Sequence, residues 1–131
     1  MRTFVQEYEI HSSIEKVWSA LTDSSQMENL AGPARMDTSE GMKFSLWGGK
    51  VYGTNIEVVP YQRLVQEWYA GDWKEPSILT IKLHKGINTV RVEILHENLP
   101  DNEYEKTENL WREFIKNLQA LFQLFEVFYY D

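Results

Sequence analysis

Three histidines are the residues of this sequence best suited to bind a metal ion or to transfer a proton near neutral pH. They are His11, His84 and His96, and none has a second histidine four residues away, the spacing that places two imidazole ligands on one helix face. A zinc site needs three or four converging ligands. Cysteine is absent, which excludes disulfides, thiol catalysis and thiolate metal sites. We therefore predict no metal ion and no cofactor.

His96 has the same parity as Val92 and Ile94, which are expected to face the core from a strand over residues 89–96. Two interpretations of its side chain follow. As the last residue of the strand, His96 forms hydrogen bonds with solvent or with a loop. Alternatively, it lies at the rim of a cavity, where its imidazole is available to a ligand.

Acidic side chains come in close pairs, such as Glu7 with Glu9 and Glu103 with Glu105. General acid catalysis needs a carboxyl group in an apolar site that raises its pKa. These pairs instead occur on polar faces, and the pair at the start of the last helix complements the helix dipole. The sequence contains no Gly-x-Ser-x-Gly, no phosphate-binding loop and no dinucleotide fingerprint. We therefore predict that the protein is not an enzyme.

Composition excludes several classes of partner. The formal net charge is −7, with 20 acidic against 13 basic residues, and no run of Lys and Arg interrupts this balance. Nucleic-acid affinity comes largely from basic side chains that neutralise phosphates, so we exclude nucleic acid and anionic membrane surfaces. The N-terminus lacks an apolar signal segment, and nowhere do about 18 apolar residues follow one another. The 131 residues are predicted to form one cytoplasmic domain, residues 1–131.

Period-two alternation predicts a series of strands. Residues 4–10 alternate apolar and acidic side chains, as expected of a strand buried on one face. The same period recurs over residues 42–46, 51–59, 64–69, 78–83 and 89–96. Gly48-Gly49 is expected to form a two-residue hairpin turn between two of these strands.

Three capping boxes predict where helices begin. In a capping box, the polar side chain of the cap residue accepts a hydrogen bond from a free backbone amide, and the side chain of a glutamate three residues later accepts one from the backbone amide of the cap residue. The three boxes start at Ser12, Ser25 and Asn102. The first two precede short helices. The third precedes a helix of about 22 to 26 residues, which would be about 35 Å long at 1.5 Å per residue. Its apolar stripe recurs at helical spacing and consists of Trp111, Phe114, Ile115, Leu118, Leu121, Phe122 and Phe125.

Most of the chain carries a recognisable order of motifs. The segment from Ile10 to Asp23 resembles the first strand and helix of the START-like superfamily, also called helix-grip or Bet v 1-like. A second set of motifs extends from Gly41 to Phe122. Its pieces are Gly41-Met-Lys-Phe44, Gly48-Gly49, Val51-Tyr-Gly53, Leu64-Val65, Trp68, Gly71-Asp-Trp73-Lys-Glu-Pro76, Thr80-Ile81, Asn88-Thr89, Leu99-Pro100, Thr107, Trp111 and Leu118. This second set resembles the C-terminal domain of the activator of heat shock protein 90 ATPase.

The resemblance implies a fold and a function. The expected fold is α+β helix-grip, in which a curved antiparallel sheet wraps around a long C-terminal helix and two short helices follow the first strand. The expected function is that of a non-enzymatic, stress- or chaperone-linked binding module whose partner is an Hsp90-type chaperone. The alternative is a carrier or sensor of an apolar small molecule, lipid-like or aromatic, held in the cavity between sheet and helix.

Such a cavity would be lined by apolar side chains from both the sheet and the last helix. An empty void of about 300 Å³ would forgo about 7 kcal/mol at roughly 24 cal/mol per Å³, comparable to a whole domain's stability of roughly 5–15 kcal/mol. The space is therefore filled by side chains, hydrated or occupied by a ligand, and its mouth is expected near Trp73 and the loop before Gly32. The predicted ligand-binding residues are Phe44, Leu46, Trp68, Trp73, Leu79, Ile81, Val92, Ile94, Trp111, Phe114, Ile115 and Leu118.

The last residues, 125–131, are unusually aromatic for a chain terminus. A contiguous apolar patch of this kind invites association when it is exposed to water. If the final turns fold back near Trp18, the protein is a monomer. If they instead contact a second copy, the protein is a weak homodimer.

Overall fold

The computed structural model describes the backbone of residues 1–130 and the side chains of residues 1–122 of the 131-residue chain. The elements follow one another as the α+β class predicts. They are β1 (Arg2–Ile10), α1 (Ile14–Thr22), α2 (Ser24–Ala31), β2 (Lys43–Leu46), the 3₁₀ turn η1 (Trp47–Gly49), β3 (Val51–Val59), β4 (Arg63–Ala70), β5 (Ser77–Lys85), β6 (Val90–Leu99), the 3₁₀ turn η2 (Asp101–Glu103) and α3 (Tyr104–Tyr130).

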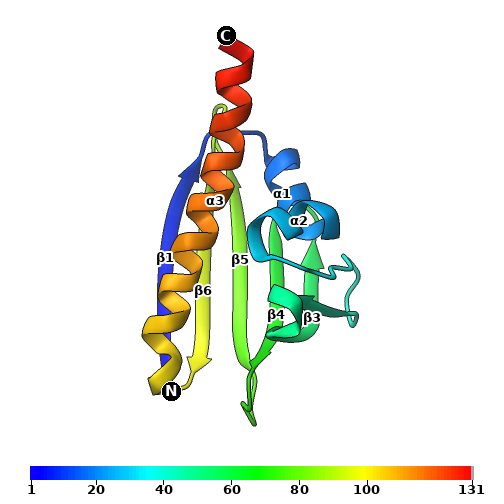
Figure 1. The fold of residues 1–131 in the computed structure, drawn as a ribbon, viewed down its shortest axis with the longest axis vertical. Helices are drawn as coiled ribbons and strands as arrows, with labels where there is room; N and C mark the ends of the chain where they lie inside the picture. Colours follow the sequence, from blue (N-terminus) through cyan, green and yellow to red (C-terminus); the bar gives the residue numbers. More distant parts are fainter. Residues whose placement is uncertain (131) are drawn as a thin grey trace.

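The strands of residues 1–130 form one six-stranded sheet in the order β1-β6-β5-β4-β3-β2, and every neighbouring pair is antiparallel. The long helix α3 crosses one face of the sheet over β1, β6 and β5, and α1 and α2 lie beside it on the same face (Figure 1). This arrangement confirms the predicted helix-grip fold. It leaves the opposite face of the sheet without a helix in the part of the chain that is described.

The core lies between the sheet and α3, as the alternation of the strands predicts. In β1, Phe4 and Ile10 are buried while Glu7 and Glu9 face outward. Strand β6 buries alternate residues in the same way. The helix side of the core consists of Trp111, Phe114, Ile115 and Leu118, each at most 2% exposed.

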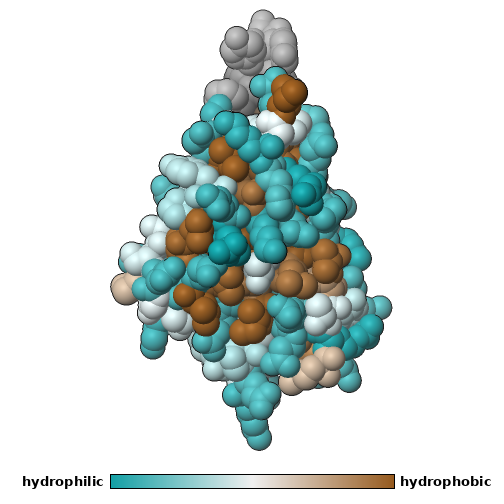
Figure 2. All heavy atoms as spheres, turned by 180° about the vertical axis from the view of Figure 1, so that it is seen from behind, coloured by the Kyte–Doolittle hydropathy of each residue, from teal (hydrophilic) through white to brown (hydrophobic). Residues whose placement is uncertain are grey.

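The outer face of the sheet is partly apolar. Val5 lies opposite Leu95, Leu95 opposite Thr80, and Thr80 opposite Val65, so these four residues form a row across four strands. Figure 2 shows apolar side chains on this face, interspersed with hydrophilic ones. Charged residues flank the row, and Arg91 donates to Glu7 at 3.0 Å.

The helices begin at different residues from those that the capping boxes predict. Ser13, rather than Ser12, caps α1, and its hydroxyl oxygen accepts from the backbone N–H of Lys16 at 3.2 Å. Asp23, rather than Ser25, caps α2. Because the backbone N–H of Asp23 also bonds the last turn of α1, the second helix starts as soon as the first one ends. The predicted cap Asn102 likewise lies within the turn η2, whose N-cap Pro100 forms no side-chain hydrogen bond, and α3 starts at Tyr104.

The predicted two-residue hairpin at Gly48-Gly49 is also wrong. Strand β2 ends at Leu46 and β3 begins at Val51, so four residues connect them, and three of these form η1. The N–H of Gly48 donates to the carbonyl oxygen of Pro33 at 2.8 Å. This contact with the segment after α2 holds the connection in a wider turn, which local sequence alone does not specify.

The backbone of α3 comprises 27 residues, slightly more than predicted. The predicted contacts of residues 125–131 lie outside the described side chains. Among the described residues, no helix is both long and apolar enough to cross a membrane.

Trp111 tests how much the helix–sheet interface contributes to stability. Its side chain is 2% exposed, so the Trp111→Ala variant leaves a large cavity. We expect the free energy of unfolding, measured by urea titration, to fall by about 3–5 kcal/mol. Lys116→Ala, a substitution on the exposed side of the same helix, serves as the control and should change it by less than about 0.5 kcal/mol. Equal losses in the two variants would contradict the packing described here.

Candidate functional site

A cluster of aromatic rings joins α3 to the centre of the sheet. Trp68 of β4 stacks on Trp111 of α3 with ring centroids 5.3 Å apart, and Phe114 meets Trp111 edge-on at 5.1 Å. Gly53 of β3 makes this cluster possible, because a Cβ atom there would lie 1.7 Å from the carbonyl oxygen of Glu67 on β4. The cluster therefore depends on a close approach of two strand backbones that only glycine permits.

His96 lies inside this cluster and is fully buried. The indole N–H of Trp111 donates to its Nδ1 at 3.1 Å, and Ser77 Oγ lies 2.8 Å from its Nε2. Because Nδ1 accepts, the proton of the neutral ring lies on Nε2, which donates to Ser77. Burial lowers the pKa of His96 from 6.5 to about 3. The expectation of a strand-end histidine bonded to solvent or a loop is wrong, because β6 continues to Leu99 and keeps His96 under α3.

The Ser77–His96 pair has the separation of a nucleophile and its base but the opposite proton arrangement. A serine nucleophile is activated by an unprotonated imidazole nitrogen, while a carboxylate holds the proton on the other nitrogen. Here the nitrogen next to Ser77 carries the proton, and the partner of the other nitrogen is Trp111. Both Ser77 and His96 are 0% exposed. The pair therefore acts as a structural hydrogen bond.

A second set of buried polar groups continues from the cluster toward the segment after α2. Trp68 donates from Nε1 to Gln66 at 2.9 Å, and Gln66 donates to the side-chain oxygen of Asn55 at 2.9 Å. Asn55 in turn donates to the backbone carbonyl oxygens of Asp37 and Ser39. An unpaired buried polar group costs about 1–3 kcal/mol, so this chain of bonds orients Trp68 relative to the loop.

The structure brings the twelve predicted ligand-binding residues together, but mainly as a packed core. Eleven of them are buried, and Trp73 is partly buried. Two of the twelve, Trp68 and Trp73, line a pocket of about 430 Å³. The other ten fill the space between sheet and helix.

This pocket, called the tryptophan pocket below, lies where η1, the β4–β5 loop and the first turns of α3 meet. Its volume is within the range of roughly 300–1,000 Å³ that is usual for small-molecule sites. Trp73 lines it as expected, whereas the loop before Gly32 does not. Its lining residues are Trp47, Lys50, Val51, Trp68, Ala70, Gly71, Asp72, Trp73, Glu103, Lys106, Thr107 and Leu110.

Trp47 is a wall of the pocket that the sequence pattern did not identify. Its φ of 50° lies in the left-handed region, which is unfavourable for a residue with a side chain. The Gly48–Pro33 hydrogen bond and edge-on contacts with the rings of Trp68 and Phe114 hold it there. The signal in the sequence was a tryptophan next to two glycines in a turn, where such a ring would otherwise be exposed.

Trp73 forms another wall of the pocket and is held by its loop. Its backbone N–H donates to the carbonyl oxygen of Ala70 at 3.1 Å, after a left-handed turn at Gly71. At the end of the loop, Asn98 donates to the carbonyl oxygen of Pro76 at 3.0 Å. The loop is thus tied to the sheet at both ends, and Trp73 lines the same pocket as residues from the first turns of α3.

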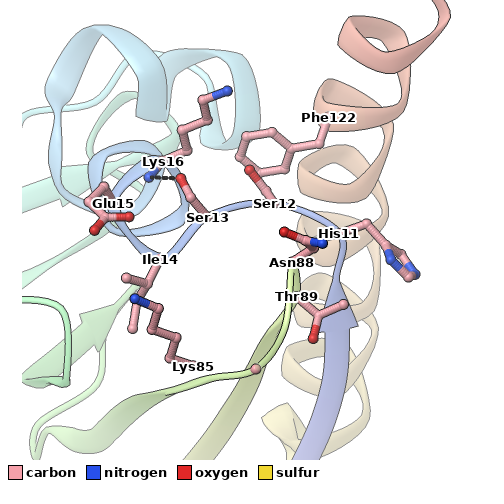
Figure 3. A pocket seen from close by; sticks show the side chains of 11 residues that line it. His11, Ser12, Ser13, Ile14, Glu15, Lys16, Lys85, Asn88, Thr89 and Phe122 are labelled. Carbon is pink, nitrogen blue, oxygen red and sulfur yellow. Dashed lines mark hydrogen bonds between the residues drawn. The ribbon is translucent and has the colours of Figure 1, made fainter.

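A second pocket, of about 380 Å³, lies at the other end of the sheet (Figure 3). It is formed by the β1–α1 junction, the turn between β5 and β6, and Phe122 of α3. Its lining is mainly polar, and Ser13 is already engaged in capping α1. The tryptophan pocket is the better candidate site, because its walls offer the large apolar surfaces that bind organic ligands.

The family of the chain follows from comparison with known proteins. A family model described as Activator of Hsp90 ATPase homolog 1-like protein matches residues 11–123. The chain belongs to this family.

Two curated relatives carry related names. An activator of 90 kDa heat shock protein ATPase homolog from Dictyostelium discoideum is 37% identical over 79 residues, which are 58% of this chain and 21% of that protein. A homolog 2 of the same activator from Mus musculus is 23% identical over 74 residues, 56% of this chain and 22% of that protein. The chain thus matches about a fifth of the length of these relatives.

Solved structures share the fold over nearly the whole chain. The crystal structure of an HSP90 activator from Plasmodium falciparum has a TM-score of 0.85 and 26% identity, and the match covers 94% of this chain and 97% of that one. A protein from Mesorhizobium loti has a TM-score of 0.84 and 23% identity over 93% and 97% of the two chains.

Burial of neutral His96 predicts a loss of stability in mild acid. The folded-state pKa of about 3 lies below the ordinary histidine value of 6.5, so the unfolded chain binds this proton first as the pH falls. The contribution of His96 to stability is complete above about pH 6.5 and is lost progressively between that value and about pH 3, at roughly 1.4 kcal/mol per pH unit. Between pH 7 and pH 5, urea unfolding should show a loss about 2 kcal/mol larger than in His96→Gln, which does not titrate. If the free energy of unfolding depended equally on pH in the wild-type protein and in His96→Gln, His96 would not be buried in its neutral form.

Proposed function

We propose that this protein is a non-enzymatic, cytoplasmic binding module that acts on an Hsp90-type chaperone. The observation that carries the proposal is the family match over residues 11–123. It is supported by the likeness to the Plasmodium falciparum HSP90 activator, which covers 97% of that chain and 94% of this one. The curated activators are much longer, and the matched region is about a fifth of each of them.

The absence of catalysis is part of this proposal. It is supported by the arrangement of the groups that could react. His96 and Ser77 are buried and bonded in the wrong sense for nucleophilic attack. The carboxylates of Glu7 and Glu93 lie on the outer face of the sheet, where Glu7 pairs with Arg91 and Glu93 lies 3.5 Å from His84.

A chaperone ATPase assay tests the proposal directly. The ATPase rate of an Hsp90-type chaperone is measured against increasing concentrations of this protein, and binding is measured separately by calorimetry. We expect saturable stimulation with the same midpoint as binding. Another protein of similar size and net charge is the control for non-specific effects. Binding without stimulation would reduce the proposal to a chaperone-binding module, and the absence of both would overturn it.

A second function is favoured by the tryptophan pocket. We propose that the protein alternatively carries or senses an apolar small molecule there, since three tryptophans line a space of about 430 Å³. Mass spectrometry of molecules released when the purified protein is denatured tests this without a prior guess about the ligand. A stoichiometric apolar compound is expected, and its retention should be lost in Trp73→Ala.

The proposed oligomeric state is a monomer or a weak homodimer. Deletion of residues 127–131 removes four of the aromatic and aliphatic residues at the end of the chain. If these residues form a homodimer contact, light scattering will show a concentration-dependent mass that the deletion abolishes. A monomeric mass before and after deletion would exclude the dimer.

A further inference from the structure

The tryptophan pocket is surrounded by hydrogen-bond donors that have no partner. Within residues 1–122, the indole N–H groups of Trp47 and Trp73 and the ammonium groups of Lys50 and Lys106 form no hydrogen bond or ion pair. In the same residues, Nε2 of His84 is the buried side-chain nitrogen or oxygen atom that forms no hydrogen bond, so neither indole nitrogen belongs to this buried, unbonded class. Both indole N–H groups are therefore reachable from solvent. By contrast, the indole N–H of Trp68 is already bonded to Gln66.

The start of α3 adds to this donor character. Lys106 and Thr107 lie in the first turn of a helix of 27 residues. The N-terminus of a helix carries a partial positive charge of about half a unit, which favours an anion nearby. Two carboxylates, Asp72 and Glu103, also line the pocket and oppose this preference. The two ammonium groups balance these two charges, and the two indole N–H groups and the helix start are the further donors for an acceptor.

The walls determine the shape of the ligand. Trp47, Trp68 and Trp73 present flat aromatic surfaces, and Val51 and Leu110 supply aliphatic ones. Aromatic side chains bind flat rings by stacking or edge-on contact, with centroids about 4.5–7 Å apart. A planar ring system among the tryptophans, with its acceptor group toward the two lysines, would satisfy both the apolar and the polar part of the lining.

We propose that the tryptophan pocket binds a flat aromatic carboxylate. This ligand class rests on the second function proposed above, the carrier or sensor of a small molecule. It adds to that function a charge preference, which comes from Lys50, Lys106 and the helix start rather than from the apolar walls. It also assigns Trp47 and Trp73 as the residues that contact the ring.

Three probes of the same shape separate the charge preference from simple apolar binding. They are 2-naphthoate, its neutral carboxamide and 2-naphthylmethylamine, each titrated into the full chain by calorimetry. We expect the carboxylate to bind about five- to tenfold more tightly than the carboxamide, as expected for added charge-assisted hydrogen bonds. The amine should bind most weakly. In heteronuclear NMR spectra, the indole N–H signals of Trp47 and Trp73 should shift, while that of Trp18, which does not line the pocket, should remain in place.

Substitutions of exposed residues test the assignment without risk to folding. Lys50→Gln and Lys106→Gln should each weaken binding of 2-naphthoate about two- to fivefold, the effect of losing one exposed charge contact. Asp72→Asn should strengthen it by a similar factor. Lys74→Gln is the matched control, since Lys74 follows Trp73 directly but does not line the pocket.

The outcomes distinguish this inference from the proposal on which it rests. If the carboxamide shifts Trp47 and Trp73 and binds as well as the carboxylate, the anionic class is overturned while the small-molecule function stands. Tighter binding of the amine would overturn the anionic class in the same way. If none of the three probes shifts either indole signal, the ligand class is overturned, and the mass-spectrometry test described above decides the small-molecule function separately.

Discussion

The hydrogen bond from the Trp111 indole to His96 is the interaction on which the arrangement of this domain depends. It joins the long helix to the middle of the sheet inside a region where neither partner can reach water. Burial of the Trp111 ring supplies most of the free energy, because a net hydrogen bond contributes only about 1 kcal/mol. The bond instead sets orientation, since a rotated or shifted helix would leave two buried polar atoms unpaired. This bond requires a neutral His96, because both nitrogens of a protonated imidazole ring carry a proton and neither can accept a hydrogen bond.

The same constraint decides where open space remains for the proposed ligand. With Trp111 and Trp68 stacked at 5.3 Å, the middle of the helix–sheet interface is closed by side chains. Space remains at the start of α3, where residues of η1, of the β4–β5 loop and of the helix line the tryptophan pocket together. A domain closed in the middle and open at one end is compatible with a role at a chaperone surface as well as with a small-molecule site. Family membership supports the chaperone role, and the chemistry of the pocket supports the small-molecule role.

Much of the fold could be predicted because its elements follow local periodicity. Alternation in β1 and β6 and the stripe that begins at Trp111 indicate which side of each element is buried, and the sheet and helix meet on those sides. The errors occur where two local solutions are nearly equal in energy. Ser12 and Ser13 are both capable caps, and in the folded protein Ser13 accepts from the backbone N–H of Lys16. The turn at Gly48 is decided by its bond to Pro33, a residue distant in sequence.

The sequence alone determined the fold class, the buried face of each strand and the placement of Trp111 against the sheet, because hydrophobic burial acts on patterns within a few residues. Only the tertiary structure decided that His96 is enclosed rather than at a rim, since its surroundings come from β4, β5 and α3. The same holds for the pocket. Trp47, Trp73 and Lys106 are far apart in the chain and become one site only when the sheet closes against the helix, because a cavity is a property of packing between elements and has no local signature.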